Sequence, residues 1–419
     1  LHEIPHQLEM LASVTKWAGR IDSPERTESM VADAFARLAE GRPRPVALEV
    51  PVDVLEAPAT HAATDRRPTA PPPPDLSGLE AAVALLRSAE RPLVVAGGGV
   101  MQSGAWAELR LVAERLQAPV LLTANARGAL PSDHPLAFNV VSAKSLVGSA
   151  DVILAVGTRF AAARGERFQL EPTQHLIRID ADSEELSRDA SPEVAIAADA
   201  LRPLSMLAES VPEVVSNGWR GLEELHAEAH RKIEAVQPQA AFGAAIRAAL
   251  PDDTVIIGGM TQLGYWSQIG LPVRQPRTYL GAGYQGALGF EVPTGLGAQV
   301  GSPQARVVAL SGDGGFMFNV QELATAAQYR IPAVFVVFND GAYGNVKRTQ
   351  RERFGRVIAS ELKNPDLVRL AESFGITAFR AEGPEALGQA LRQAMDADGP
   401  VLIDAPVGEM PAVWPLLRA

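Results

Sequence analysis

Two apolar runs in the last third of the chain, each ending in a turn rich in glycine and acidic residues, constrain the fold most. The run 307–311 leads into Gly-Asp-Gly-Gly, and the run 333–338 leads into Asn-Asp-Gly-Ala-Tyr-Gly. A helical pattern lies between them. Because a strand–helix–strand crossover of this length places parallel strands side by side, Asp313 and Asp340 are predicted to leave the same edge of a sheet.

These two turns also predict what binds at that edge. In open α/β sheets, ligands bind in the crevice beyond the carboxyl ends of the strands. Carboxylate oxygens suit Mg²⁺, and glycine lets backbone N–H groups approach a phosphate closely. A Gly-Asp-Gly by itself is often only a turn, so the prediction of a divalent cation holding a diphosphate rests on both turns together.

Along the whole chain, short apolar runs alternate with helical patterns. This alternation predicts the α/β class with doubly wound parallel-sheet domains, one of them Rossmann-like. The first unit has too few elements to close a sheet core, and the chain opens on Leu1, so we expect further residues upstream. The predicted units are the end of an α/β domain at 1–58, a proline-rich linker at 59–76, a middle domain at 77–203, a helical connection at 204–238 and a diphosphate-binding domain at 239–419.

Composition excludes several classes of function. The net charge is -11 over 419 residues, with no basic stripe, so nucleic-acid binding is not expected. No apolar run approaches the roughly 20 residues that a membrane-spanning helix needs. The chain has no cysteine, which excludes thiolate metal sites and is compatible with a reducing cytoplasm. We therefore expect a cytoplasmic protein that acts on small molecules.

Several segments resemble one enzyme family. The turn at 312–315 with the strand and turn that follow resembles the thiamin diphosphate (ThDP) fingerprint, and 279–303 (YLGAGYQGALGFEVPTGLGAQVGSP) resembles the start of the diphosphate domain of acetolactate-synthase-like enzymes. Residues 1–7 and 42–54 resemble the end of their pyrimidine-binding domain. The resemblance implies a ThDP- and Mg²⁺-dependent enzyme that decarboxylates a 2-oxo acid, with aldehyde release or carboligation, and that forms a homodimer or homotetramer.

The resemblance also implies roles for single residues. Asp313 and Asp340 would bind Mg²⁺ through their side chains, and Ala342 through its backbone carbonyl. Many relatives have Asn where Asp340 stands, so the second carboxylate is a departure; Asn339 is interpreted as a turn former. The residues implied to line the cofactor are Met260, Thr261, Gly286, Leu288, Gly312, Asp313, Gly314, Gly315, Asp340, Ala342, Tyr343 and Gly344.

The coenzyme has to be bent and activated. Leu288 would wedge under it, so that the aminopyrimidine nitrogen reaches the thiazolium C2, and the Gly286 carbonyl would hold the pyrimidine amino group. The alternative is that Leu288 belongs to the core. The family's activating glutamate has no match in this chain, and we expect it upstream of residue 1, in another subunit, or lost. In the last case the chain would be a ThDP-binding non-catalytic subunit or remnant.

The middle domain carries a glycine turn, Gly97 to Gly99, after a predicted strand. Acetolactate synthases bind FAD in this domain, but the segment after DHPLAFN is shorter and less glycine-rich here. A vestigial nucleotide fold is therefore favoured over bound FAD, and a turn that merely packs is common. A nicotinamide-dependent dehydrogenase using this turn would leave the paired carboxylates unexplained.

The sequence gives the least information on the residues that contact the substrate. Thr349 stands where acetolactate synthases have a tryptophan, which puts acetolactate synthesis in doubt. Lys347, Arg348 and Gln350 could face the substrate or form a solvated helix surface.

Histidines outside these motifs give weaker signals. The i, i+4 spacing of His226 and His230 can bind zinc, but HExxH is absent and a solvated helix face is favoured. His2, with the neighbouring Glu3, could face the active site or be structural.

Overall fold

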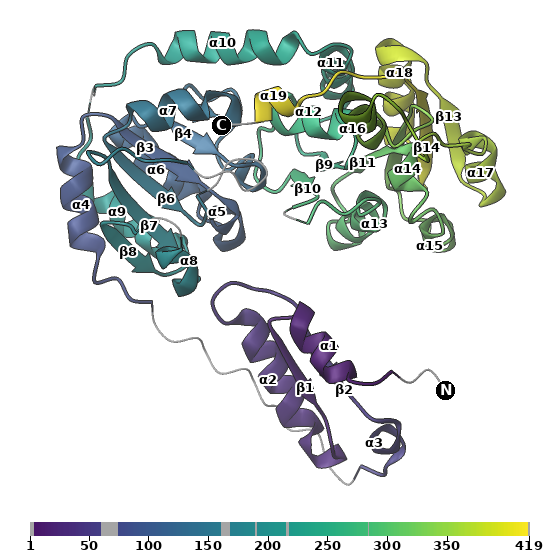
Figure 1. Ribbon diagram of the computed structural model, residues 1–419, viewed down its shortest axis with the longest axis horizontal. Helices are drawn as coiled ribbons and strands as arrows, with labels where there is room; N and C mark the ends of the chain where they lie inside the picture. Colours follow the sequence, from purple (N-terminus) through teal and green to yellow (C-terminus); the bar gives the residue numbers. More distant parts are fainter. Residues whose placement is uncertain are drawn as a thin grey trace.

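The strands form one small and two large parallel sheets (Figure 1). All pairings between the strands are parallel, which confirms the predicted α/β class. His2, Glu3 and most of the predicted linker lie outside the described residues. The computed structural model describes residues 4–59, 74–160, 168–188, 191–214, 218–283 and 285–417.

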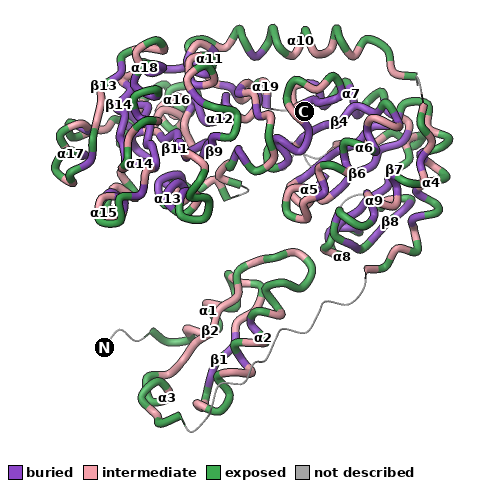
Figure 2. The backbone as a smooth tube through the Cα atoms, turned by 180° about the vertical axis from the view of Figure 1, so that it is seen from behind, coloured by how far each residue is buried: buried purple, intermediate pink, exposed green. Residues whose placement is uncertain are grey.

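The N-terminal segment is a single strand–helix–strand unit. Figure 2 shows it largely exposed or half-buried, and two apolar residues of its long helix, Val31 and Phe35, are exposed. Two strands and one such helix bury too little apolar surface to close a core by themselves. Its elements are α1 (Gln7–Val14), β1 (Trp17–Arg20), η1 (Pro24–Arg26), α2 (Thr27–Ala39), β2 (Val46–Glu49) and α3 (Val52–Glu56).

The middle domain is a doubly wound sheet with strand order β5-β4-β3-β6-β7-β8. Separate apolar clusters cover its two faces, because alternate residues of a strand point to opposite sides. Its strands are β3 (Pro92–Ala96), β4 (Val120–Leu122), β5 (Ala137–Phe138), β6 (Val152–Val156), β7 (His175–Asp180) and β8 (Val194–Ala197). Its helices are α4 (Leu79–Ser88), α5 (Gly98–Ser103), α6 (Trp106–Leu116), η2 (Ala124–Ala126), η3 (Val140–Ser142), α7 (Ala143–Ser149), α8 (Ser183–Ser187) and α9 (Leu201–Ser210).

The predicted helical connection at 204–238 is not one continuous helix. It contains most of α9 and, after a break, α10 (Leu222–Glu234). Leu204 and Leu207 of α9 are fully buried in the middle-domain core, so this helix packs with the sheet before it. Only α10 spans from the middle domain towards the last domain (Figure 1).

The last domain holds the second six-stranded sheet, with strand order β10-β9-β11-β12-β14-β13. Its strands are β9 (Val255–Gly258), β10 (Tyr279–Gly281), β11 (Val307–Gly312), β12 (Val334–Asn339), β13 (Thr377–Arg380) and β14 (Val401–Pro406). Its helices are α11 (Gln239–Ala249), α12 (Gln262–Gly270), α13 (Glu291–Gly301), α14 (Asp313–Phe316), α15 (Glu322–Gln328), α16 (Gly344–Phe354), α17 (Leu367–Ser373), α18 (Gly383–Met395) and α19 (Trp414–Leu417). In the part of the chain that the structure describes, no helix has the length and apolar character needed to cross a membrane.

A buried arginine joins the two large domains. The guanidinium of Arg127, in the middle domain, donates hydrogen bonds to the carbonyls of Ser267 and Leu271 at the end of α12, and lies 4.9 Å from the ring centre of Tyr279. Burial lowers its pKa. Because α12 begins directly after Met260 and Thr261, this contact also holds the helix that follows two of the predicted cofactor residues.

Candidate active site

The two acidic turns meet at the carboxyl ends of neighbouring strands. β11 and β12 pair in parallel, with Gly312 opposite Phe338. Asp313 follows the first strand and Asp340 follows the second. The backbone N–H of Gly341 donates to Oδ2 of Asp313 over 2.9 Å, so the first carboxylate touches the second turn. The two side chains therefore lie close together at one edge of the sheet, which agrees with the predicted pairing of the strands.

The electrostatics of this pair are unfavourable without a cation. Burial raises the pKa of Asp313, which is 2% exposed. Burial and then the negative charge of Asp313 raise the pKa of Asp340 to about 6. Two carboxylates in a poorly solvated site disfavour each other's ionisation, and a divalent cation between them removes that cost.

The oxygen atoms of the site fit a magnesium ion. Oδ2 of Asp313 accepts hydrogen bonds from Gly341 and from Asn364, so neither of these donors occupies Oδ1. Among the described residues, no group of three or more Asp, Glu, His or Cys side chains is placed to hold a metal. Mg²⁺ bound with a diphosphate needs fewer protein ligands, because phosphate and water supply the rest. Two carboxylates and the carbonyl of Ala342 would complete the protein's share.

Glycine is required where the turns pack on each other. A Cβ built on Gly314 would lie 2.5 Å from Cε1 of Tyr343, and one on Gly312 would lie 3.2 Å from Cβ of Thr261. Side chains at these positions would close the space between the loops. The structure therefore brings the residues predicted to line the diphosphate together from three separate turns.

The loop before α13 contributes the remaining residues that are predicted to bind the cofactor. A Cβ on Gly286 would lie 3.1 Å from Cε of Met260, so these two predicted cofactor residues are neighbours. Leu288 is 41% exposed, which excludes the alternative that it is a core residue. An exposed apolar side chain near the glycine turns is able to contact the coenzyme, and the predicted role of Leu288 in bending it stays a prediction.

Comparisons with known proteins agree with this geometry. Residues 259–405 match the model described as thiamine pyrophosphate enzyme, C-terminal TPP binding domain, and residues 79–207 match the central domain of the same enzymes. A protein named "Probable 2-ketoarginine decarboxylase" from Pseudomonas aeruginosa is 33% identical over 96% of this chain and 74% of its own length. The chain belongs to the thiamin diphosphate-dependent enzymes.

Two further relatives carry another name. The "Acetolactate synthase large subunit" of Corynebacterium glutamicum is 32% identical, over 97% of this chain and 69% of its own length. The "Probable acetolactate synthase large subunit" of Methanocaldococcus jannaschii is 31% identical, over 97% of this chain and 74% of its own length. These identities are nearly equal, so they support a ThDP enzyme of this group without separating decarboxylase from synthase.

Asp340 gives a pH-dependent prediction for this ThDP enzyme. Its pKa is raised from 3.8 to about 6, so the folded, metal-free state loses stability as pH rises through this window. We expect Asp340→Asn to raise the stability of the metal-free protein at pH 7.5 by about 1–2 kcal/mol, after allowing for partial solvent screening, and to have little effect at pH 4. Melting temperatures at the two pH values measure this.

The same substitution should weaken the metal site. With Mg²⁺ and ThDP present, we expect the wild type to be more stable than Asp340→Asn, because the second negative charge strengthens binding of the cation. A variant that is less stable than the wild type in metal-free buffer at pH 7.5 would contradict the proposed repulsion. Asp366→Asn is the matched control, since Asp366 is an exposed carboxylate that caps α17.

Residues proposed for substrate contact are tied to nearby loops. Lys347 pairs with Glu361 at 3.0 Å, and Arg348 donates to the carbonyl of Met410 over 2.5 Å. Gln350 donates to the carbonyl of Ile358 over 3.1 Å. These contacts hold α16 against the segments around it, and a direct role towards substrate stays a prediction.

The two histidines of α10 have different partners. His226 stacks on Phe138 with ring centres 3.9 Å apart and hydrogen-bonds the carbonyl of Pro135, whereas the exposed His230 pairs with Glu234. The favoured interpretation of a solvated helix face therefore fits His230, whereas His226 packs against the middle domain.

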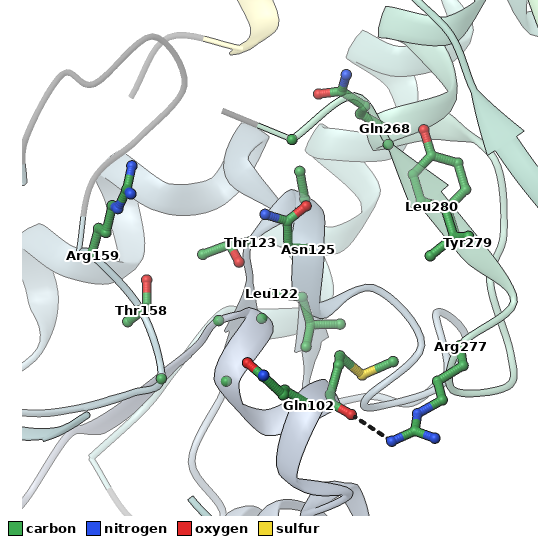
Figure 3. A pocket seen from close by; sticks show the side chains of 18 of the residues that line it. Gln102, Leu122, Thr123, Asn125, Thr158, Arg159, Gln268, Arg277, Tyr279 and Leu280 are labelled. Carbon is green, nitrogen blue, oxygen red and sulfur yellow. Dashed lines mark hydrogen bonds between the residues drawn. The ribbon is translucent and has the colours of Figure 1, made fainter. Parts of the chain in front are cut away.

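A cleft of about 1610 Å³ lies between the middle and diphosphate domains (Figure 3). It is lined by Asn125 and Arg277 and reaches Met260.

The glycine turn of the middle domain borders this cleft. The N–H groups of Gly97 and Gly99 donate to the carbonyls of Val156 and Gly157. The N–H groups of these two glycines therefore pair with the neighbouring strand end, which favours the packing interpretation of this turn. The preference for a vestigial nucleotide fold over FAD stays a prediction.

Sequence analysis missed two polar residues at the site. Asn364 contacts Asp313, but Asn-Pro-Asp before a helical pattern looks like an ordinary helix start. Glu291 is only 1% exposed, and its carboxylate accepts a hydrogen bond from Ser311, the residue before the Gly312–Gly315 turn. Burial raises the pKa of Glu291. Glu291 is the only charged residue of the stretch 290–300, and this was the available signal.

Proposed function

We propose that this protein catalyses the ThDP- and Mg²⁺-dependent, non-oxidative decarboxylation of a 2-oxo acid, followed by aldehyde release or carboligation. The observation that carries the proposal is the pair Asp313 and Asp340 at adjacent strand ends, beside glycine turns that only small residues can form. Membership of the family identifies ThDP as the coenzyme.

The chain's residues would bind and orient the cofactor. Asp313, Asp340 and the carbonyl of Ala342 would hold Mg²⁺, which would neutralise the charge of the diphosphate. Gly314 and Gly315 would let backbone N–H groups reach its oxygens. When bound, ThDP supplies a carbon nucleophile and an electron sink for the loss of CO₂. Leu288 and the carbonyl of Gly286 would hold the two rings in the reactive arrangement.

One residue, Thr349, favours decarboxylation with aldehyde release over acetolactate synthesis. Thr349 lies exposed on α16, where the resemblance places a tryptophan in acetolactate synthases. The relative named for 2-ketoarginine suggests testing 2-oxo acids with a cationic tail. Acetolactate synthase remains the second candidate, because two of the reported relatives bear that name.

A homodimer or homotetramer is part of the proposal. Phe318, just after the first metal turn, is 56% exposed, and Phe354 at the end of α16 is 70% exposed. Exposed apolar side chains of this size, one of them just after the predicted metal turn, suit burial against a second copy of the chain. The cysteine-free sequence is compatible with the proposed cytoplasmic location.

The test is CO₂ release from a panel of 2-oxo acids by the full-length protein with ThDP and Mg²⁺. The panel includes pyruvate, a branched-chain 2-oxo acid and a 2-oxo acid with a guanidinium tail. We expect release that requires both cofactors, and product analysis separates aldehyde from acetolactate. No binding of ThDP with Mg²⁺ and no CO₂ from any substrate would contradict the proposal.

A further inference from the structure

Hydrogen bonds connect polar side chains in a series that crosses the sheet towards Asp313. Arg380 on β13 donates to Oδ2 of Asp404 on β14 at 3.0 and 3.2 Å. Asn339, the last residue of β12, donates to Oδ1 of Asp404 over 3.2 Å. Asn364 donates to Oδ1 of Asn339 over 3.0 Å and to Oδ2 of Asp313 over 2.5 Å. We name Arg380, Asp404, Asn339 and Asn364 the amide relay.

The relay follows the order of the strands. In the sheet, β11, β12, β14 and β13 are consecutive neighbours. Asp313, Asn339, Asp404 and Arg380 come from these four strands or the turns directly after them, and Asn364 bridges the first pair. The series is therefore a consequence of the tertiary structure, since its members are spread over residues 313–404 of the sequence.

The chemistry of its ends fixes the direction of each hydrogen bond. An arginine can only donate and an ionised carboxylate can only accept. The amide nitrogen of Asn339 must therefore face Asp404, which leaves its oxygen towards Asn364. Asn364 then turns its amide nitrogen to this oxygen, and the second hydrogen of that nitrogen reaches Asp313. Neither amide can be flipped without breaking hydrogen bonds in the series.

Burial makes these bonds costly to lose. Asp404 is fully buried at 0% exposure and Asp313 is 2% exposed, while the Arg380 side chain is 50% exposed and connects the series to solvent. Unpaired polar groups in such positions are strongly disfavoured. The relay is thus a rigid support with one end at the surface and the other at the predicted metal ligand.

The bond to Asp313 selects one of its two oxygens. Gly341 and Asn364 both donate to Oδ2, and the backbone N–H of Gly314 also stabilises the carboxylate. Oδ2 is held by these donors, and the carboxylate of Asp313 also contacts the side chain of Asp340, so Oδ1 is the oxygen that neither Gly341 nor Asn364 occupies. Hydrogen bonds from such supporting residues commonly orient metal ligands and tune metal affinity.

We propose that Asn364 is a positioning residue which, held by Asn339 and Asp404, presents Oδ1 of Asp313 to the divalent cation. The inference rests on the proposed function, because it needs Asp313 to be a metal ligand. It assigns Asn339 to support of the site and explains why an asparagine precedes Asp340.

The test measures Mn²⁺ binding to the full-length protein in the presence of saturating ThDP, through the electron paramagnetic resonance signal of free Mn²⁺. We expect Asn364→Ala to raise the Kd for Mn²⁺ about 10- to 100-fold. Asn339→Ala, which leaves every direct contact of Asp313 in place, should raise it less. Gln393→Ala, which removes an exposed amide side chain on α18, is the matched control and should leave the Kd unchanged.

Activity gives a second readout. At saturating Mn²⁺ and ThDP, Asn364→Ala should regain most of the wild-type kcat, because a positioning defect in metal binding is overcome by concentration. An unchanged Kd in folded Asn364→Ala would overturn the inference and leave the proposed function intact. If Asn364→Ala does not fold, an unchanged Kd in Asn339→Ala overturns it. Failure of the wild type to bind Mn²⁺ with ThDP would overturn the proposed function together with the inference.

Discussion

Replacing Asp313 with asparagine is expected to weaken binding of Mg²⁺ with ThDP at least about 100-fold, and to lower CO₂ release by a similar factor. The loss of one negative charge is only part of the reason. Asn364 and the N–H of Gly341 both donate towards the position of Oδ2. These donors would attract the single amide oxygen of the new side chain, so its NH₂ group would face the cation.

Calorimetric titration of ThDP in the presence of Mg²⁺ measures the effect. Asp366→Asn is the matched control, because it makes the same chemical change at an exposed helix cap where asparagine is also a good capping residue. We expect the control to bind like the wild type. Equal affinities for Asp313→Asn and wild type would show that Asp313 is not a ligand, and the proposed site would have to be abandoned.

Replacing Arg127 with alanine is expected to lower the stability of the protein by about 3 kcal/mol. The buried guanidinium satisfies two carbonyls at the end of α12. Its removal takes away the donor to the Leu271 carbonyl and leaves the Ser267 carbonyl with the long 3.4 Å hydrogen bond from the Leu271 N–H. The cation–π contact with Tyr279 is lost as well. The midpoint of urea unfolding, followed by tryptophan fluorescence, reports the change because Trp266 lies buried in α12.

A neighbouring arginine supplies the control. Arg274 bridges Asp133 of the middle domain and Asp252 of the last domain at 3.0 and 2.8 Å, but its side chain is 38% exposed. Exposed ion pairs contribute at most about 1 kcal/mol. Arg274→Ala should therefore shift the unfolding midpoint much less than Arg127→Ala. Similar shifts for the two variants would mean that burial at the domain junction is not what makes Arg127 important.

The strands that could be predicted from sequence differ physically from those that could not. β3, β6, β9, β11, β12 and β14 contain continuous apolar runs, because both of their faces are covered. The edge strands of the two large sheets are β5, β8, β10 and β13. Edge strands are short or only partly buried, so they leave a weak apolar pattern in the sequence.

For the candidate site, local patterns identified the residues that follow strand ends. Asp313 and Asp340 could be paired from sequence because a crossover connection makes successive strands neighbours. Asn364 and Glu291 could not be found this way. Asn364 lies in a loop beyond α16, and Glu291 begins a helix whose side chain turns inward beneath Ser311. Their contacts depend on how distant segments pack, which local spacing does not encode.

The sequence by itself determined the α/β class, the two acidic turns and the glycines that leave room for a diphosphate, because these follow from patterns over a few residues. Only the tertiary structure decided which oxygen of Asp313 is held by hydrogen bonds, and hence which oxygen we propose to face the cation. That choice comes from Asn364, Asn339, Asp404 and Arg380, whose hydrogen bonds form when four strands align in one sheet. Hydrogen bonds act over about 3 Å, so only the folded chain brings such distant residues within reach of one another.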